Sequence, residues 1–347
     1  MVEEVANIDN VAAITAEKSG AEIIEQRKKK LSEFFKKTNV WVILLVIALL
    51  VLGIYIRVQP MTNHNGHPGL WDVTTNSWTL GPDLDPYLFL RQAKQLIEQG
   101  SLPNIDYMRN VPLGFANSQD TRILTPYMIA LTYKITSIFT KINVDYAGVV
   151  FPVIMFALTI IAFFFFVREI FRGKDKESKV KANIIALISS LFMIIIPAFL
   201  SRTVAGIPEK ESSAFFLMFL AFYLFLKAWK TENLKASIVF SVLAGISTGI
   251  MGLVWGGISY AYVTIGGAVL IAFILNKVHK KEFIIYLPWL LISVAMISIF
   301  GNVPLTDFLI GADTALAFLV LFIMVVHFAI WKTKIKEYFS SKHCLSI

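Results

Sequence analysis

Two acidic motifs contain the residues of this sequence that are best suited to do chemistry. The first is GPDLDPY at residues 81–87, in which Asp85 precedes a proline at the start of an expected helix. At or near the helix N-cap, Asp85 would accept hydrogen bonds from free backbone N–H groups. Carboxylates in an Asp-x-Asp spacing also suit a hard cation such as Mg²⁺ or Mn²⁺. This motif therefore predicts either a helix cap or part of a metal site.

The second motif is SRTVAGIPEKE at residues 201–211, in which Glu209 and Glu211 stand at the start of an expected membrane helix. Acids at this position interact favourably with the helix dipole, and that alone explains them. Two carboxylates so spaced, close to Arg202, also resemble half of a metal site, and ionisable groups at a membrane edge are functional candidates. Both interpretations are open for this motif as well.

The composition indicates that membrane helices position both motifs. Of the 347 residues, 56% are hydrophobic and 16% are charged, whereas a soluble domain carries about 25% charged residues. The polar N-terminal residues do not form a cleavable signal peptide, so the first apolar run is expected to stay as an anchor. We predict an all-α integral membrane protein with about eight spans. The apolar runs are 38–56, 146–167, 182–201, 212–226, 236–276 (two helices that meet near Gly252–Gly257), 283–306 and 314–331.

Lysine and arginine predict the orientation, because cytoplasmic connections between spans are enriched in basic residues. The basic clusters fall on alternate connections, at 27–37, 168–181, 227–235, 277–281 and 332–336. Both termini are therefore expected in the cytoplasm, and the connections that carry the acidic motifs are expected outside. The net charge of +8 is interpreted as a sign of orientation in the bilayer, and no nucleic-acid partner is expected.

The first external connection, residues 57–145, is long enough to have a function of its own. It contains an expected helix, Tyr87–Gln99, which Gly100 ends. An alternative makes Ile123–Phe139 a ninth span, which would place the basic connection 168–181 outside. We interpret Ile123–Phe139 instead as an amphipathic segment on the membrane surface.

The predicted topology places both acidic motifs on the same external face. Asp85, Glu209 and Glu211 could then hold one divalent cation together. Such a cation would neutralise the charge of a pyrophosphate leaving group.

The sequence resembles a known family, the catalytic subunits of the archaeal-type oligosaccharyltransferases of protein N-glycosylation. The resemblance rests on DPYLFLR at 85–91, on SRTVAG at 201–206 followed by the acid-x-acid triplet, and on GLVWGG at 252–257. It extends from Val40 to Trp331. It implies a GT-C-type multi-span helical bundle. Such an enzyme transfers an oligosaccharide from a dolichol-phosphate or dolichol-pyrophosphate carrier to the Asn of an Asn-x-Ser/Thr sequon.

The resemblance also implies roles for single residues. Asp85, Glu209 and Glu211 would bind Mn²⁺ or Mg²⁺, and Asp85 would take part in catalysis by facing the acceptor amide. Arg202 is either a contact to the donor phosphate or an ion-pair partner of one of the glutamates. Trp255–Gly257 is interpreted as close helix packing. The implied partners are the dolichol-linked donor, the acceptor polypeptide and the lipid bilayer of a cell membrane, with the active face external.

We divide the chain into a cytoplasmic tail (1–37), a transmembrane glycosyltransferase region (38–331) and a short basic cytoplasmic tail (332–347). The family's soluble C-terminal domain, with its Trp-Trp-Asp-Tyr-Gly motif, has no counterpart in these residues. We therefore expect a fragment, a truncated gene product or a short paralogue. Alone, this chain is expected to transfer glycan poorly or not at all, and a separate chain is a candidate source of the missing half.

Three other functions stay open. The chain could be a truncated, non-catalytic paralogue, another membrane glycosyltransferase that uses a lipid-phosphate-linked sugar, or a transporter or channel. The SRTVAG segment followed by acid-x-acid is not expected in the second class. Acids that gather at one membrane face, and not at mid-membrane, disfavour the third.

Overall fold

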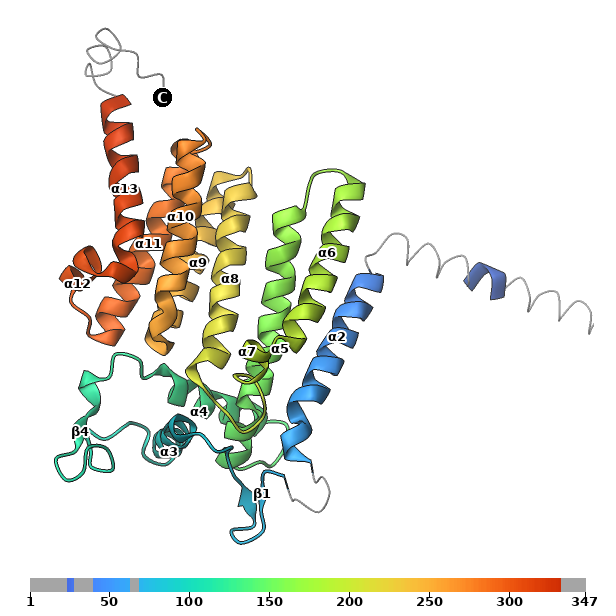
Figure 1. Cartoon of the computed structure of the whole chain (residues 1–347), viewed down its shortest axis with the longest axis vertical. Helices are drawn as coiled ribbons and strands as arrows, with labels where there is room; N and C mark the ends of the chain where they lie inside the picture. Colours follow the sequence, from blue (N-terminus) through green and yellow to red (C-terminus); the bar gives the residue numbers. More distant parts are fainter. Residues whose placement is uncertain (1–23, 28–39, 63–68, 332–347) are drawn as a thin grey trace, which may run out of the picture. The chain divides into compact units, whose positions relative to one another are not determined.

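The computed structural model of the chain (Figure 1) describes residues 24–27, 40–62 and 69–331. The predicted tails, 1–37 and 332–347, lie outside these residues except for one helical turn at 24–27. The structure divides into two compact units, Met1–Leu49 and Leu50–Ile347. The second unit contains both acidic motifs.

Seven helices of the described residues are long and apolar enough to cross a membrane, and an eighth, α13 (Ala312–Trp331), has a shorter apolar stretch at Thr314–Ala329. The prediction of an all-α membrane protein with about eight apolar helices is confirmed. The seven are α2 (Val40–Val58), α5 (Val144–Phe171), α6 (Lys176–Ile195), α8 (Lys210–Lys230), α9 (Leu234–Val254), α10 (Ser259–Ile274) and α11 (Lys280–Gly301).

Turn residues set the ends of these helices. The predicted break in the long run 236–276 is confirmed, because α9 ends at Val254 and α10 follows a 3₁₀ turn, η3 (Gly256–Ile258). The third span differs from its prediction. It begins earlier, because Asp175 caps α6 by accepting from the Ser178 N–H at 2.7 Å. It also ends earlier, because the residue before Pro197 is driven out of the helical region, and the short helix α7 (Pro197–Leu200) follows.

Small residues allow α9 to pack closely between α8 and α11. A Cβ atom built on Gly245 would lie 2.8 Å from the Trp289 carbonyl oxygen, and one on Gly252 would lie 2.5 Å from Ile297 Cδ1. Trp289 is fully buried, and its indole Nε1–H donates to Thr248 Oγ1 at 3.0 Å. Small residues and interhelical hydrogen bonds of this kind hold helices together in a bilayer, where water cannot drive association.

We predict that Gly245→Ala destabilises the bundle by about 1–3 kcal/mol, because the new methyl group meets the backbone of α11. Thermal unfolding of the purified chain in detergent, followed by circular dichroism, measures the effect. Gly267→Ala in α10 is the matched control, since its Cβ would meet nothing closer than Leu316 Cδ2 at 3.8 Å. Equal melting temperatures for the two variants would contradict the predicted packing of α9 on α11.

The connection between α2 and α5 forms a small layer at the end of the bundle where α5 and α8 begin (Figure 1). It contains α3 (Leu84–Gln99), α4 (Leu124–Thr136) and two short antiparallel hairpins. These are β1 (Trp71–Asp72) with β2 (Ser77–Trp78), and β3 (Ile105–Asp106) with β4 (Phe115–Ala116).

Helix α3 is the predicted helix of this connection, and Gly100 ends it in the left-handed conformation as expected. It starts three residues earlier than predicted, because Asp83, and not Asp85, is its N-cap and accepts from the Leu84 N–H at 2.8 Å. Helix α4 has 13 residues, fewer than the roughly 20 needed to span a bilayer. Its fully buried Ile129 packs with α3 and α5, so α4 is not a ninth span.

Candidate functional site

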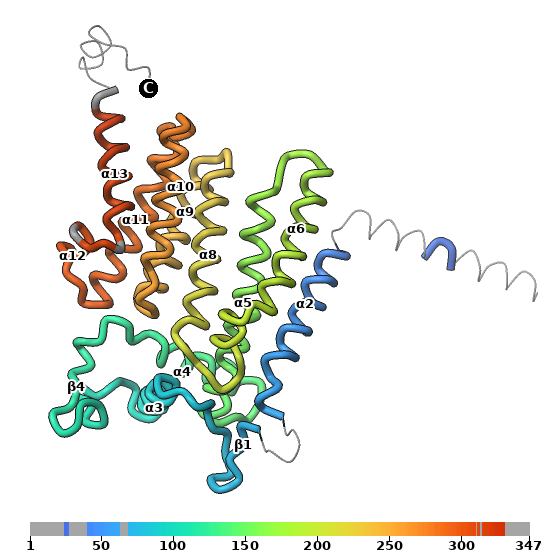
Figure 2. The backbone as a smooth tube through the Cα atoms, viewed as in Figure 1, coloured from blue at the N-terminus to red at the C-terminus, as the bar shows by residue number. Residues whose placement is uncertain are grey.

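Backbone hydrogen bonds join the two acidic motifs. The Gly81 N–H of the first motif donates to the Gly206 carbonyl of the second at 2.8 Å. The Gly206 N–H in turn donates to the Val149 carbonyl of α5, and the Ala205 N–H donates to the Arg57 carbonyl of α2, both at 2.9 Å. Figure 2 shows this segment passing from α7 to α8 beside the start of α3. The SRTVAG segment therefore fixes the position of one motif against the other.

Gly206 is required at this junction, both for its backbone conformation and for its lack of a side chain. Its φ of +85° lies in the left-handed region, which is costly for residues with a Cβ atom. A Cβ atom would also lie 2.5 Å from Leu70 Cδ1 and 3.2 Å from the Gly81 nitrogen. The glycine of SRTVAG thus lets the first external connection approach the second.

Arg57 supports the junction from the last turn of α2 and is fully buried. Its Nε–H donates to Thr203 Oγ1 at 2.8 Å, and its Nη2 donates to the Ile194 carbonyl at 3.2 Å. The guanidinium carbon lies 3.6 Å from the centre of the Phe156 ring, a cation–π contact. The sequence interpretation missed Arg57, although an arginine at the end of an apolar run, ahead of the first loop, was a usable signal.

The structure brings the carboxylates of both motifs into one neighbourhood. Glu209 is buried at the N-cap of α8, Glu211 and Asp83 are half-buried, and Asp85 is exposed in the first turn of α3. Burial, a side-chain hydrogen bond with Asp83 and the nearby charges of Glu211, Asp83 and Asp85 together raise the pKa of Glu209 to about 7, with burial the largest cause. Asp83 was not among the predicted site residues, although the Asp-x-Asp spacing contained it.

Arg202 and Trp255 contact the two glutamates. Arg202 Nη1 lies 3.8 Å from Glu209 Oε1, so the ion-pair interpretation of Arg202 describes its position here, while its side chain stays 45% exposed. The Trp255 Nε1–H donates to Glu211 Oε1 at 3.1 Å. The turn after α9 therefore does more than pack helices, because its tryptophan orients an acid of the second motif.

Carboxylate oxygens are the donors that Mg²⁺ and Mn²⁺ prefer, and mutual repulsion among four acids would be relieved by a cation. In the part of the chain that the structure describes, however, no three acidic, histidine or cysteine side chains are close enough together to hold a metal ion. Asp85, Glu209 and Glu211 are thus neighbours that fit a hard cation by chemistry and charge. Their side chains would have to turn toward a common point to coordinate it.

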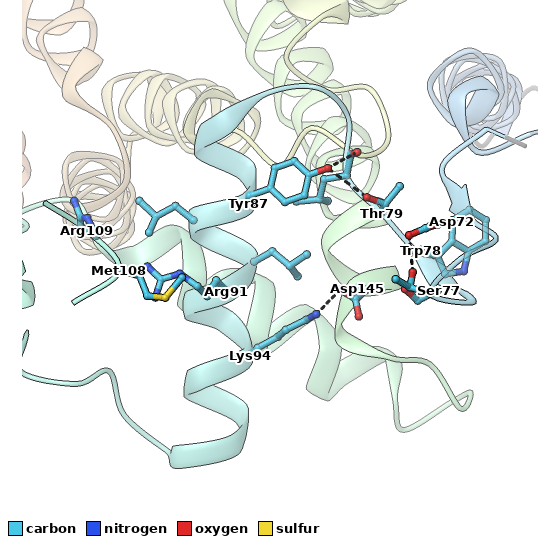
Figure 3. Close-up of a pocket in the computed structure, with 14 residues that line it drawn as sticks. Asp72, Ser77, Trp78, Thr79, Tyr87, Arg91, Lys94, Met108, Arg109 and Asp145 are labelled. Carbon is cyan, nitrogen blue, oxygen red and sulfur yellow. Dashed lines mark hydrogen bonds and ion pairs between the residues drawn. The ribbon is translucent and has the colours of Figure 1, made fainter. Parts of the chain in front are cut away.

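A groove of about 630 Å³ lies on the other side of Tyr87, between α3 and the β1–β2 hairpin (Figure 3). The Tyr87 hydroxyl donates to the Leu80 carbonyl at 3.0 Å, next to Gly81 of the first motif. An ion pair crosses the groove, with 2.6 Å between Lys94 Nζ and Asp145 Oδ1. Asp85 does not line the groove, but Leu88, one helical turn after it, does.

Arg91 of the first motif holds the β3–β4 hairpin to α3. Its Nη1 donates to Asp106 Oδ1 at 3.0 Å, its Nη2 donates to Asp106 Oδ2, and Asp106 is 2% exposed. Burial alone would raise the pKa of Asp106, but hydrogen bonds from Arg91 and the Met108 N–H, with the charges of Arg91 and Arg109, outweigh burial and lower it. This motif arginine therefore has a structural partner within its own loop.

We predict that Asp106→Asn destabilises the chain at neutral pH by about 1.5–3 kcal/mol, because it removes the charge of a buried carboxylate that accepts two hydrogen bonds from Arg91. The pKa of Asp106 is lower in the folded chain than in the unfolded chain. Its contribution to the free energy of unfolding is therefore present above the unfolded-state pKa of about 3.9, and it is lost as pH falls through the folded-state pKa. The melting temperatures of wild type and Asp106→Asn should therefore converge as the pH is lowered. Lys94→Met, which breaks a more exposed pair, should cost only about 0–1 kcal/mol. A difference in melting temperature between Asp106→Asn and wild type that stays the same in acid would show that ionisation of Asp106 does not stabilise the chain.

Comparison with known proteins gives matches over most of the chain. A family model described as oligosaccharyl transferase STT3, N-terminal, matches residues 39–345. The dolichyl-diphosphooligosaccharide–protein glycosyltransferase subunit STT3A of Oryza sativa subsp. japonica is 25% identical over 122 residues, 35% of this chain and 15% of the relative.

Solved structures of the Archaeoglobus fulgidus oligosaccharyltransferase have a similar fold. One, AglB in complex with an inhibitory peptide and a dolichol-phosphate, has a TM-score of 0.67 and 18% identity over 90% of this chain. Another, in complex with Zn and sulfate, has a TM-score of 0.64 and 18% identity over 83% of this chain. The chain spans 35% and 36% of those two proteins. It thus has the GT-C-type transmembrane fold, as predicted.

Proposed function

This chain belongs to the STT3 family of oligosaccharyl transferases, and on that premise we propose that it carries the donor-binding half of a protein N-glycosylation site. The proposed reaction moves an oligosaccharide from a dolichol-phosphate or dolichol-pyrophosphate carrier to the Asn of an Asn-x-Ser/Thr sequon. The observation that carries the proposal is the hydrogen-bonded junction between Gly81 and Gly206, which gathers the acids of both motifs.

We propose Asp85, Glu209 and Glu211 as the residues that would hold Mn²⁺ or Mg²⁺, with Asp83 as an additional neighbour. When bound, the metal would neutralise charge on the donor phosphate oxygens. Trp255 keeps Glu211 in place through its hydrogen bond, and the buried position of Glu209 makes it costly to leave ionised without a cation. Arg202, which is 45% exposed and 3.8 Å from Glu209, is proposed as the contact to the donor phosphate, because guanidinium groups bind phosphate oxygens.

Asp85 is proposed to face the acceptor, because it is the exposed carboxylate of the four. In the transfer, the bond between the anomeric carbon and the carrier phosphate breaks as the Asn nitrogen bonds to that carbon. The nitrogen loses one proton, and a carboxylate beside it favours that loss. The groove lined by Tyr87 and Leu88 of the same helix gives a hydroxyl-rich or peptide substrate room within one helical turn of Asp85.

The orientation in the cell membrane, with both termini cytoplasmic and the acids external, is part of the proposal. Its support is the alternation of basic clusters along the chain. That this chain alone transfers glycan poorly or not at all stays a prediction. So does the contribution of a separate chain, or of further residues, to the recognition of the sequon.

The proposal is tested by glycosylation of a sequon peptide in membranes of the source cell that carry Asp85→Asn. Loss of the carboxylate should lower transfer by about a hundredfold or more, because it acts on the reacting atoms, and a metal chelator should lower wild-type transfer similarly. Glu177→Gln is the control, since Glu177 is an exposed carboxylate of α6 that pairs with Lys181 at 2.7 Å and lines neither the acid cluster nor the groove. Wild-type transfer by Asp85→Asn would refute the assignment of the site.

A further inference from the structure

A second charged site lies at the opposite end of the bundle from the acids. It is a pocket of about 420 Å³ between the α5–α6 turn and the last turn of α8. Helix α5 starts beside the layer that contains α3 and α4, and its 28 residues rise about 42 Å along the helix axis. Figure 1 shows the α5–α6 turn and the end of α8 at the far end from α3. This pocket is therefore separate from the acid cluster.

The lining has a large surplus of positive charge. Five basic side chains surround the pocket, and Glu169 is its only lining carboxylate among the described residues. Lys174 also pairs with Glu232 at 2.9 Å outside the lining, so three positive charges are left uncompensated. The basic side chains are Arg172, Lys174, Lys179, Lys227 and Lys230. They come from three separate segments, the end of α5 with its turn, the start of α6 and the end of α8.

Buried Glu169 organises two of these cations. It is 5% exposed, and its Oε2 lies 3.6 Å from Arg172 Nη1 and 3.7 Å from Lys227 Nζ. Lys230 Nζ donates to the carbonyls of Ile170 at 3.1 Å and Arg172 at 3.3 Å. One carboxylate thus sets the geometry of the cationic wall without neutralising it.

Helix capping and membrane orientation explain only part of this arrangement. Cations in the last turns of α5 and α8 interact well with the helix dipoles there, and basic residues at one membrane side are expected for orientation. Lys179 fits neither capping role, because it lies near the N-terminus of α6, where a cation opposes the dipole. Asp175 already caps that helix N-terminus, so an anion in the pocket would be attracted by Lys179 together with the cations of α5 and α8.

We infer that this pocket binds the phosphate headgroup of an anionic membrane lipid. The pocket lies at the ends of three apolar helices, where lipid phosphates are found, and basic pockets between membrane helices select anionic headgroups. Each lysine or arginine near an anionic membrane surface contributes about 1 kcal/mol, which corresponds to about a fivefold change in affinity.

The test is native mass spectrometry of the full chain in detergent, titrated with phosphatidylglycerol and, separately, with phosphatidylcholine. Wild-type protein should retain more phosphatidylglycerol than phosphatidylcholine. Lys179→Gln should weaken that binding by about fivefold. Lys181→Gln is the matched control, because Lys181 is on the same helix, pairs with Glu177 at 2.7 Å and does not line the pocket.

Three outcomes would overturn the inference. Equal retention of both lipids would show that the pocket does not select an anionic headgroup. Equal losses in Lys179→Gln and Lys181→Gln would show that general surface charge, and not the pocket, binds the lipid. Displacement of phosphatidylglycerol by soluble glycerol phosphate, with the same dependence on Lys179, would assign the pocket to a soluble phosphate instead of a lipid.

Discussion

Gly206→Ala is expected to lower both Mn²⁺ affinity and glycan transfer by more than about tenfold, although residue 206 carries no chemical group. The alanine would have to adopt a left-handed backbone, at about 1–2 kcal/mol, and its Cβ would meet Leu70 and the Gly81 backbone, at about 1–3 kcal/mol more. Relief of that strain would break the hydrogen bond from Gly81 to residue 206. The first motif would then move away from Glu209 and Glu211.

Gly100→Ala separates the two contributions. Gly100 has a φ of +80°, close to that of Gly206, but a Cβ atom there would meet nothing within 4 Å. Gly100→Ala therefore introduces a similar backbone strain but no collision with Leu70 or with the Gly81 backbone. Mn²⁺ titration and transfer in membranes should distinguish the two variants. If both lose activity to the same degree, then general strain, and not the junction, is the cause.

Arg57→Ala is expected to produce the second large effect, a destabilisation of about 3–5 kcal/mol, because it removes a buried side chain together with its charged hydrogen bonds. Thr203 would lose the donor that fixes the SRTVAG segment, and Phe156 would lose its cation–π partner. The melting temperature of the chain in detergent measures the first effect, and transfer in membranes of the source cell measures the second.

Arg57→Met distinguishes packing from hydrogen bonding, because methionine fills much of the same space without a donor. We expect it to recover part of the lost thermal stability, since a buried charge is costly to desolvate. Transfer should stay low, because the Thr203 hydroxyl still lacks its Arg57 donor. Full recovery of transfer by Arg57→Met would mean that Arg57 only fills space.

The sequence predicted those features that depend on local pattern. Long uncharged runs are specific to bilayer spans, so the apolar helices and the break near Gly252–Gly257 were predicted with small errors at their ends. Gly100 marked the end of α3 because a left-handed residue stops a helix there. The two acidic motifs were also found, since carboxylates at the start of a membrane helix are rare enough to be noticed.

The contacts that build the site were not predictable, because they join residues far apart in the sequence. Nothing local indicates that Gly81 pairs with Gly206, that Arg57 reaches Thr203, or that Trp255 reaches Glu211. Asp83, and not Asp85, caps α3 because the Leu84 N–H donates a hydrogen bond to the Asp83 side chain. Where the residues of the two acidic motifs meet is therefore a property of the fold.

The most direct test of the acidic site is Mn²⁺ binding to the purified full chain in lipid nanodiscs, followed by electron paramagnetic resonance. The account predicts a saturable site in the wild type that is lost in Glu209→Gln and retained in Asp120→Asn, whose carboxylate pairs with Arg109 outside the acid cluster. Equal Mn²⁺ binding by all three proteins would contradict the claim that the two acidic motifs form one metal site.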